Sequence, residues 1–447
     1  MTNIPLPDKE INSVYSVKQM QSPIDSFISL IYDDELEEIM YIGQKSTVKV
    51  IHRKQGMCDT DFKMNQADAN KMIEKILDSS YILDKSANII NTSLSDGSRI
   101  NIMRGGIVAE GPVITIRKFK QEPITVIDLI KNQSISVDFA AFMWMCIEGL
   151  NMSPSNIIFC GGTSSGKTTL LNAFSIFVPK YSRIITIEDC LELRVIHPHL
   201  VSLESTEKIS MQRLVKATLR MRPDRMIIGE VRDKEAQDLF TAMNVGYSGC
   251  MGTLHSNSSR ETITRITNRP MDVPLILLRN LDLIVMQKRR LSNGRTKRYI
   301  SEVSEISGSE GENPLLNTIF SFNTTSNCLE KTNVPSRTRA KIVGELGITI
   351  FEFERIFSKR KRILSLLAER SENFKNKELL EVFDKQSKHT TSHNLSSSTV
   401  GQTTDEPVQS NIHHNSHHNL HEKKRKRKQE DKSFLDKMGT FFEDNMF

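Results

Sequence analysis

The residues best suited to chemistry in this chain lie in one glycine-rich run, Gly161-Gly162-Thr163-Ser164-Ser165-Gly166-Lys167-Thr168. The run fits the pattern G-x-x-x-x-G-K-[ST], in which backbone N–H groups hold the phosphates of a nucleotide. The apolar stretch 156–160 before it is typical of a strand, and 169–174 after it is typical of a helix. A loop between a strand and a helix N-terminus points its amides at anions. The run therefore predicts a phosphate-binding site and not a chance glycine-rich turn.

Individual roles follow from the residue types in this loop. We expect Lys167 to contact the β- and γ-phosphates and Thr168 to bind a magnesium ion. Thr169, at the start of the expected helix, is assigned to the nucleotide together with the rest of the loop. The expected ligands are therefore ATP and Mg²⁺.

An acid follows a second apolar stretch, Met226-Ile227-Ile228-Gly229-Glu230. Open α/β sheets bind their ligands beyond the carboxyl ends of their strands, where Glu230 would lie. We expect Glu230 to hold the magnesium-bound water or to polarise the attacking water. Without the glycine-rich run upstream, a buried strand ending in a surface acid would be an equal alternative.

Three further acids, Glu188, Asp189 and Glu192, lie at the end of a strand expected at 183–188. Carboxylates that cluster near a triphosphate repel one another unless a cation or a proton lies between them. One of them is therefore expected to be the general base for water, with Glu192 as the first choice and Glu188 as the second. A solvated charged turn is the alternative.

Arginines and a histidine complete the candidate residues. Arg220 and Arg222, with Arg225, flank a Pro-Asp pair just before the second apolar stretch. Guanidinium groups aimed at a γ-phosphate stabilise the charge that develops on transfer, although local pairing with acids would serve structure alone. His255 ends the strand expected at 251–255, where it would sense the γ-phosphate or contact the acids. A histidine at a strand end is more often a structural hydrogen-bonding residue.

The secondary-structure elements that position these side chains can be predicted from the sequence. After the glycine-rich run, strands and helices alternate along the chain, which predicts a wound α/β sheet. Before it, short strands and one amphipathic helix at 67–77 predict a smaller α+β unit, with a turn at Ser95 to Ser98. Residues from about 386 are rich in Ser, Thr, Asn and His, a composition typical of disorder.

The composition of the chain argues against several classes of protein. The six cysteines include no C-x-x-C pair, so neither a zinc knuckle nor a disulfide framework is expected. No apolar run approaches the ~18 residues that span a bilayer, and charged residues near the start exclude a signal peptide. The net charge of +6 is mild, and nucleic acid is not the expected partner. The basic run 423–428 would suit an anionic membrane surface, while nucleic acid phosphates, a nuclear signal and a solvated spacer are its alternatives.

Together these runs resemble the type II/type IV secretion ATPase superfamily, and within it the branch of archaeal pilus and archaellum motors and tight-adherence pilus ATPases. Four motifs occur in the family's order: Walker A at 161–168, the Asp box at 187–192, Walker B at 219–232 and the His box at 252–257. The runs 96–101 and 111–119 resemble the family's N-terminal domain, and matching material extends from about Glu37 to Glu369.

The resemblance implies a ring-shaped homo-hexamer that hydrolyses ATP bound between the two domains of each subunit. Arg99 and Arg117 would reach the nucleotide from the N-terminal domain, and Arg220 or Arg222 from beside the Walker B strand. The implied partner is a polytopic membrane platform protein, which places the motor in the cytoplasm, peripheral to the inner face of the cell membrane.

Such a motor assembles or retracts type IV pilus-like or archaellum filaments, or drives type II-like protein secretion. The alternative is a DNA-translocating ATPase for conjugation or uptake from the same superfamily. A third hypothesis, a protein that binds ATP only as a switch, is disfavoured by the acids Glu192 and Glu230.

Three departures from the family pattern are informative. Tyr247 stands where many relatives have a histidine, which removes one proton carrier and leaves His255. Ser164 replaces a common glycine of the loop. The absence of a four-cysteine zinc insertion favours the archaeal or tight-adherence side.

The predicted fold class is α/β, with a RecA-like P-loop NTPase core, a smaller α+β N-terminal domain and a disordered C-terminal tail. The expected boundaries are an extension at 1–30, the α+β domain at 31–120, a linker at 121–136, the ATPase domain at 137–308, a mainly helical region at 309–385 and the tail at 386–447.

Overall fold

The structure is a computed structural model that describes residues 14–78, 86–94, 96–118, 123–206, 208–292, 295–310 and 313–395. The chain forms two compact units, residues 1–122 and 123–447. Each unit encloses its own apolar core, and the second unit has one core on each side of its sheet. Among the described residues, no helix has both the length and the apolar character needed to cross a bilayer.

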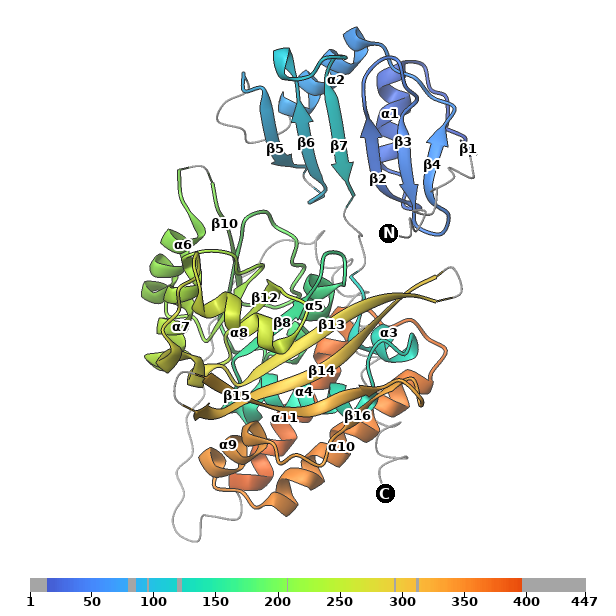
Figure 1. Cartoon of the computed structure of the whole chain (residues 1–447). Helices are drawn as coiled ribbons and strands as arrows, with labels where there is room; N and C mark the ends of the chain where they lie inside the picture. Colours follow the sequence, from blue (N-terminus) through green and yellow to red (C-terminus); the bar gives the residue numbers. More distant parts are fainter. Residues whose placement is uncertain are drawn as a thin grey trace, which may run out of the picture. The chain divides into compact units, whose positions relative to one another are not determined.

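The N-terminal unit is built on a seven-stranded sheet in the order β1-β4-β3-β2-β7-β6-β5 (Figure 1). Only β1 and β4 pair in parallel; the other neighbours are antiparallel. Two helices contribute apolar side chains to the same core. The elements are β1 (Val14–Tyr15), α1 (Pro23–Ile31), β2 (Leu36–Tyr41), β3 (Lys49–His52), β4 (Gly56–Thr60), α2 (Gln66–Asp78), β5 (Ile89–Ser93), β6 (Arg99–Met103), the 3-10 turn η1 (Gly105–Ile107) and β7 (Val113–Arg117).

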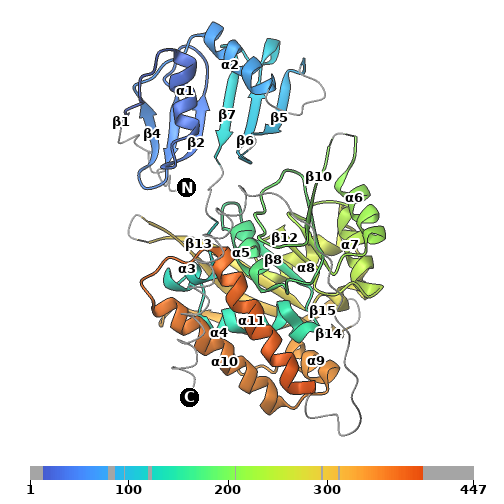
Figure 2. The ribbon, with the colours of Figure 1, turned by 180° about the vertical axis from the view of Figure 1, so that it is seen from behind.

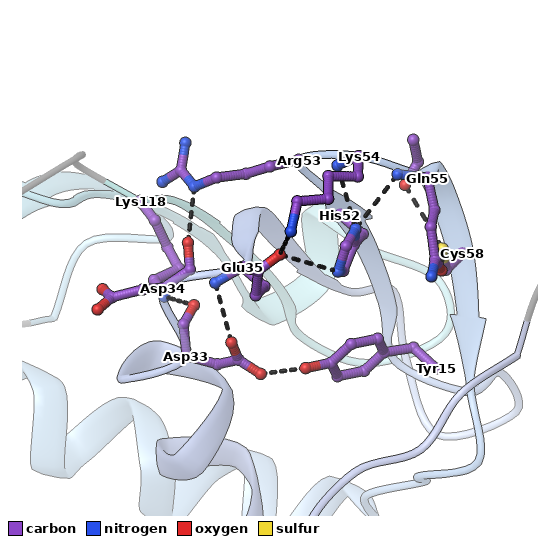
Figure 3. A network of polar contacts seen from close by, with 11 residues as sticks. Tyr15, Asp33, Asp34, Glu35, His52, Arg53, Lys54, Gln55, Cys58 and Lys118 are labelled. Atoms are coloured by element: carbon purple, nitrogen blue, oxygen red, sulfur yellow. Dashed lines mark hydrogen bonds and ion pairs between the residues drawn. The ribbon is translucent and has the colours of Figure 1, made fainter. Parts of the chain in front are cut away.

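A polar network joins the loop after α1 to the β3–β4 hairpin (Figure 3). The Tyr15 hydroxyl donates to the Asp33 carboxylate, and Lys118 Nζ donates to the Asp33 carbonyl oxygen. Burial, together with Asp33, raises the pKa of Tyr15 to about 12. His52 Nδ1 accepts from two backbone amides of the next turn, at 3.1 and 3.2 Å, and its Nε2 lies 3.6 Å from Glu35 Oε2. These contacts fix one end of the sheet.

The C-terminal unit is built on a nine-stranded sheet in the order β10-β9-β11-β12-β8-β13-β14-β15-β16. Neighbours from β10 to β13 are parallel, and those from β13 to β16 are antiparallel. The central strand β8 is buried along its whole length. The strands are β8 (Ile157–Gly161), β9 (Ile184–Glu188), β10 (Leu200–Glu204), β11 (Arg225–Ile228), β12 (Met251–His255), β13 (Leu283–Ser292), β14 (Arg295–Glu310), β15 (Asn313–Asn323) and β16 (Cys328–Lys331).

Helices cover both faces of this sheet. One core joins a face to α3, α4, α5, α9, α10 and α11, and the other joins the opposite face to α6, α7 and α8. Figure 2 shows α10 and α11 lying across the first of these faces. The helices are α3 (Val126–Lys131), α4 (Val137–Glu148), α5 (Lys167–Phe174), α6 (Met211–Thr218), α7 (Glu235–Asn244), α8 (Ser259–Thr267), α9 (Arg337–Leu346), α10 (Ile350–Glu369) and α11 (Asn376–Leu395). The 3-10 turns are η2 (Gly149–Asn151), η3 (Ser175–Phe177), η4 (Leu219–Met221) and η5 (Leu275–Asn280).

The α/β class with a smaller α+β unit is confirmed, and several element boundaries differ from those expected. The expected extension contains β1 and α1, and the expected linker contains α3. A capping box between Thr125 and Asp128 opens α3, and its apolar side chains join the core. The expected mainly helical region begins with β15 and β16, because apolar residues such as Phe320 extend the sheet. Helix α11 continues to Leu395, into the expected tail.

Some expectations fall on residues outside the described part of the chain. They are the turn residue Ser95, the strand end Phe119, most of the tail expected at 386–447 and, within that tail, the basic run 423–428.

Candidate nucleotide site

The parallel pairing of β8, β9, β11 and β12 brings the predicted acids to the same edge of the sheet as the glycine-rich loop. His255, at the end of β12, lies opposite Gly161, at the end of β8. Ile228, at the end of β11, lies opposite Ile187 on β9, so Glu230 and Glu188 follow at adjacent strand ends. This is the edge where open α/β sheets bind their ligands.

At Gly161 and Gly166 the backbone of the loop lies so close to its neighbours that a larger residue would clash with them. A Cβ atom built on Gly161 would lie 2.3 Å from the Gln287 carbonyl oxygen, and one on Gly166 would lie 3.1 Å from Arg298 Cδ. Gly166 has a φ of 99° and Ser164 a φ of 58°, both in the left-handed region. Ser164 therefore adopts a conformation that usually belongs to glycine.

Lys167 opens α5 and folds back over the loop. Its Nζ donates to the Gly162 carbonyl oxygen at 3.2 Å. Burial lowers the pKa of Lys167, while the nearby Glu230 carboxylate acts in the opposite direction. A partly desolvated ammonium beside a glycine backbone and a helix N-terminus suits an anionic ligand such as a phosphate.

A magnesium ion would have few protein ligands at this site. Thr168, in the first turn of α5, and Glu230, after β11, are the candidates, and both are half-buried. Within the described ranges, no group of three His, Cys, Asp or Glu side chains forms a metal cluster. Mg²⁺ is usually held by one or two protein groups, substrate phosphates and water, so this donor set fits the ion.

Glu188 and Glu192, the two candidates for the general base, differ in their surroundings. Glu188 is only 2% exposed, and its Oε1 accepts from the backbone N–H of Glu192 at 2.9 Å and of Leu193 at 3.0 Å. It therefore orients the turn that carries Glu192. The Glu192 side chain is half-buried at the edge of the sheet. A Cβ atom on Gly229 would lie 2.8 Å from Glu188 Cγ, so the glycine in Walker B leaves room for this carboxylate.

Arg232 was missed as a site residue by the sequence analysis. Its guanidinium donates to the Glu230 carboxylate and lies 3.7 Å from Asp189 Oδ2. The hydrogen bond that Arg232 donates to Glu230 is the main reason why the pKa of Arg232 is raised. Arg232 thus partly neutralises the acids in the structure. Its position two residues after Glu230 could have indicated a site residue. The contact with the Glu230 carboxylate depends on the turn after β11, which the sequence alone does not reveal.

Two contacts connect β12 to the site. His255 Nε2 lies 3.0 Å from Thr163 Oγ1 in the glycine-rich loop, so the structure brings these two predicted residues together. Thr253 Oγ1 donates to the Gly229 carbonyl oxygen at 2.6 Å and ties β12 to the Walker B turn. His255 is therefore placed to respond to the conformation of the loop.

Arg220 and Arg222 lie apart from the loop within one chain. Both residues precede β11, at the amino edge of the parallel strands, whereas the glycine-rich loop follows the carboxyl edge. Both side chains are exposed. Tyr247 donates from its hydroxyl to the Leu219 carbonyl oxygen at 2.8 Å and supports the turn that carries Arg220. Arg225 is buried at the start of β11 and is structural.

Arg99 and Arg117 belong to the N-terminal unit. They lie directly opposite each other on β6 and β7, so the sheet brings these two predicted residues together. Their expected contact with a nucleotide stays a prediction.

Comparisons with known proteins agree with these motifs. Residues 19–365 match the family model described as Type II/IV secretion system protein. The uncharacterized protein MJ0781 of Methanocaldococcus jannaschii is 42% identical over 229 residues, which are 49% of this chain and 32% of that protein. The uncharacterized protein MJ0900 of the same organism is 33% identical over 313 residues, 68% of this chain and 55% of that protein.

A bacterial relative and a solved structure extend the comparison. The conjugal transfer protein TrbB of Rhizobium radiobacter is 33% identical over 209 residues, 45% of this chain and 62% of TrbB. The match thus spans less than two thirds of each of these three relatives. The crystal structure of the pilus retraction motor PilT with bound ADP aligns with a TM-score of 0.45 at 17% identity, covering 78% of this chain and 96% of PilT.

Proposed function

This chain belongs to the family of type II/IV secretion system proteins, and from that premise we propose that it is an ATPase that converts hydrolysis into mechanical work. The observation that carries the proposal is the edge of the sheet where Lys167, Glu192 and Glu230 meet. Burial lowers the pKa of Lys167, and the Glu230 and Glu192 carboxylates both act to raise it. A phosphate-binding cation next to two acids is the arrangement that phosphoryl transfer to water requires.

Each residue has a distinct task in the proposed reaction. The loop amides and Lys167 bind the β- and γ-phosphates, and Glu192 accepts a proton from the attacking water. The water oxygen bonds to the γ-phosphorus while the bond to the β-phosphate oxygen breaks, which releases ADP and phosphate. Bound Mg²⁺, held by Thr168 and Glu230, would neutralise the charge that develops on the phosphate oxygens. Arg232 would have to release the Glu230 carboxylate for Glu230 to hold the ion.

The remaining arginines act between subunits in this proposal. Arg220 and Arg222 lie at the amino edge of the strands, so they would serve the nucleotide of a neighbouring copy. Arg99 and Arg117 would approach a nucleotide from the N-terminal unit. The proposed assembly is a homo-hexamer, as the family resemblance implies.

The proposed setting is the cytoplasmic face of the cell membrane, with a polytopic platform protein as the partner. The work would be the assembly or retraction of a pilus-like or archaellum filament, or type II-like secretion. The 33% identity to a conjugal transfer protein supports a second candidate, a DNA-translocating motor. Stimulation of phosphate release by DNA would favour the second candidate, and stimulation by lipid vesicles or by a platform protein the first.

The proposed chemistry is tested by phosphate release from the full chain and its Glu230→Gln variant, with ATP and magnesium. We expect the substitution to lower kcat by about 100-fold or more, because it removes a carboxylate that would hold the magnesium ion. Glu345→Gln, on the exposed surface of α9, removes the same charge and should retain wild-type activity. A Glu230→Gln protein as active as wild type would refute the role of Glu230.

A further inference from the structure

Strands β13 and β14 form a long antiparallel ribbon (Figure 1). One of its side chains contacts the phosphate-binding loop. Arg298, on β14, donates from Nε to the Ser164 carbonyl oxygen at 3.2 Å. Its Cδ would lie 3.1 Å from a Cβ atom on Gly166. The side chain is exposed, so the terminal nitrogens of the guanidinium remain open to solvent beside the loop. No motif marked this residue, because it lies far along the chain from Walker A.

A buried polar side chain lies beneath Arg298. Gln287, on β13, is paired with Gly161 on β8 and is only 3% exposed. Its Nε2 would lie 3.2 Å from a Cβ atom on Gly166, which places the amide under the loop. Its Oε1 is buried and has no hydrogen-bond partner within the described part of the chain. Such a group has a cost in free energy unless a ligand or water supplies the missing donor.

A second arginine lies opposite Arg298 on the ribbon. Arg289, on β13, pairs directly with Arg298, and both side chains are exposed. Neither forms an ion pair with any carboxylate in the described ranges. Like charges directly opposite each other on a ribbon are destabilising, so an anion between them would relieve the repulsion. The face of the ribbon that carries this pair is the face that contacts the loop.

The strand order identifies which end of a nucleotide would lie here. In the order β9-β11-β12-β8-β13, the acids that follow β9 and β11 lie on one side of β8, and β13 lies on the other. The γ-phosphate belongs beside Glu192 and Glu230. If the γ-phosphate lies on that side, the α-phosphate, ribose and base would extend toward β13 and β14.

We propose that Arg298, which pairs with Arg289 across the ribbon and borders Gly166 as Gln287 does, binds the α-phosphate side of the nucleotide held by the glycine-rich loop. The inference rests on the proposed function and adds binding residues from the β13–β14 ribbon to that site. Because ATP and ADP share the α-phosphate, Arg298 would strengthen the binding of both to the same extent. A residue at the γ-phosphate would instead favour the triphosphate.

Calorimetric titration of the full chain with ADP and with ATPγS, in the presence of magnesium, tests this inference. Arg298→Ala should weaken the binding of both nucleotides by the same factor, about tenfold or more, as expected for loss of a charge-assisted hydrogen bond. Lys297→Ala is the matched control, because Lys297 is exposed and pairs with Arg290 on the opposite face of the ribbon. It should leave both dissociation constants within about twofold of wild type.

Two results would overturn the inference while sparing the proposed function. One is a folded Arg298→Ala protein that binds both nucleotides as tightly as wild type. The other is a loss confined to ATPγS, which would place Arg298 at the γ-phosphate. A wild-type chain that binds neither nucleotide would instead refute the proposed function, and this inference with it.

Discussion

At the scale of single residues, the space around Gly229 decides where Glu188 and Glu192 can lie. Glu188 packs against this glycine and uses its carboxylate to hold the backbone of Glu192. The buried acid is therefore committed to the turn, and the half-buried acid is the better candidate for chemistry. The order of preference derived from sequence, Glu192 before Glu188, has a physical reason, although the role itself stays a prediction.

Substitution of Gly229 by alanine tests this dependence. The new Cβ would meet Glu188 Cγ at 2.8 Å and push it away from the turn. We expect kcat for ATP hydrolysis to fall about tenfold or more, because a small displacement of a catalytic group is costly. The affinity for ADP should change little, since the glycine-rich loop is untouched.

Gly308→Ala is the control for this measurement, because a Cβ atom there would have nothing within 4 Å. Wild-type kcat in Gly229→Ala, measured by steady-state phosphate release, would show that Glu188 does not govern the turn.

At the scale of elements, α4 and α10 are joined by a buried ion pair. Arg360 contacts Glu148, and its guanidinium carbon lies 4.9 Å from the centre of the Trp144 ring. Both charged side chains are almost fully buried. The pair therefore fixes the register of two helices behind the strand that leads into the loop.

Removal of one partner of the Arg360–Glu148 pair should lower the free energy of unfolding strongly, whereas removal of both partners should lower it little. We expect Arg360→Met to lower the free energy of unfolding by about 3–5 kcal/mol, because it leaves a buried carboxylate unpaired. The double variant Glu148→Leu with Arg360→Met should recover most of that loss. Urea denaturation followed by circular dichroism measures both values.

The neighbouring pair of Lys361 with Asp138 provides the comparison, since both side chains are about half exposed. Lys361→Met should change the free energy of unfolding by about 0–1 kcal/mol. Equal losses for Lys361→Met and Arg360→Met would contradict the importance of burial for the Arg360 pair.

At the scale of the whole molecule, the cysteines of the C-terminal unit test how tightly that unit is packed. Burial raises the pKa of Cys160 to about 11 and that of Cys250 to about 12. Both thiols therefore stay protonated in the folded chain between pH 7 and 9. Cys328 is exposed, and Cys190 is partly exposed.

A thiol reagent should label Cys328 first in the native chain. Labelling of Cys160 and Cys250 should become fast only on unfolding. Unfolded thiols ionise near pH 8.5, so the stabilisation from these two protonated thiols is present below that pH and is lost as the pH rises toward their folded pKa values. Mass spectrometry of labelled peptides checks the order, and early labelling of Cys250 at pH 7.5 would contradict the packing.

The sequence predicted the parts of the site that occupy short, contiguous motifs. Walker A, the acids and His255 could be proposed together because strand ends in a parallel sheet converge on one edge, and their roles stay predictions. Gln287, Arg289 and Arg298 could not, because their position depends on the register between β13, β14 and β8. The placement of Arg220 at the amino edge likewise follows from strand direction, which no local pattern contains.

Titration of the full chain with ATPγS and magnesium, beside its Lys167→Ala variant, tests the central claim most directly. The account predicts saturable binding by the wild-type chain and at least about a tenfold loss in the variant, because Lys167 is the cation of the loop. No detectable binding by the wild type, or equal affinity in the variant, would contradict it.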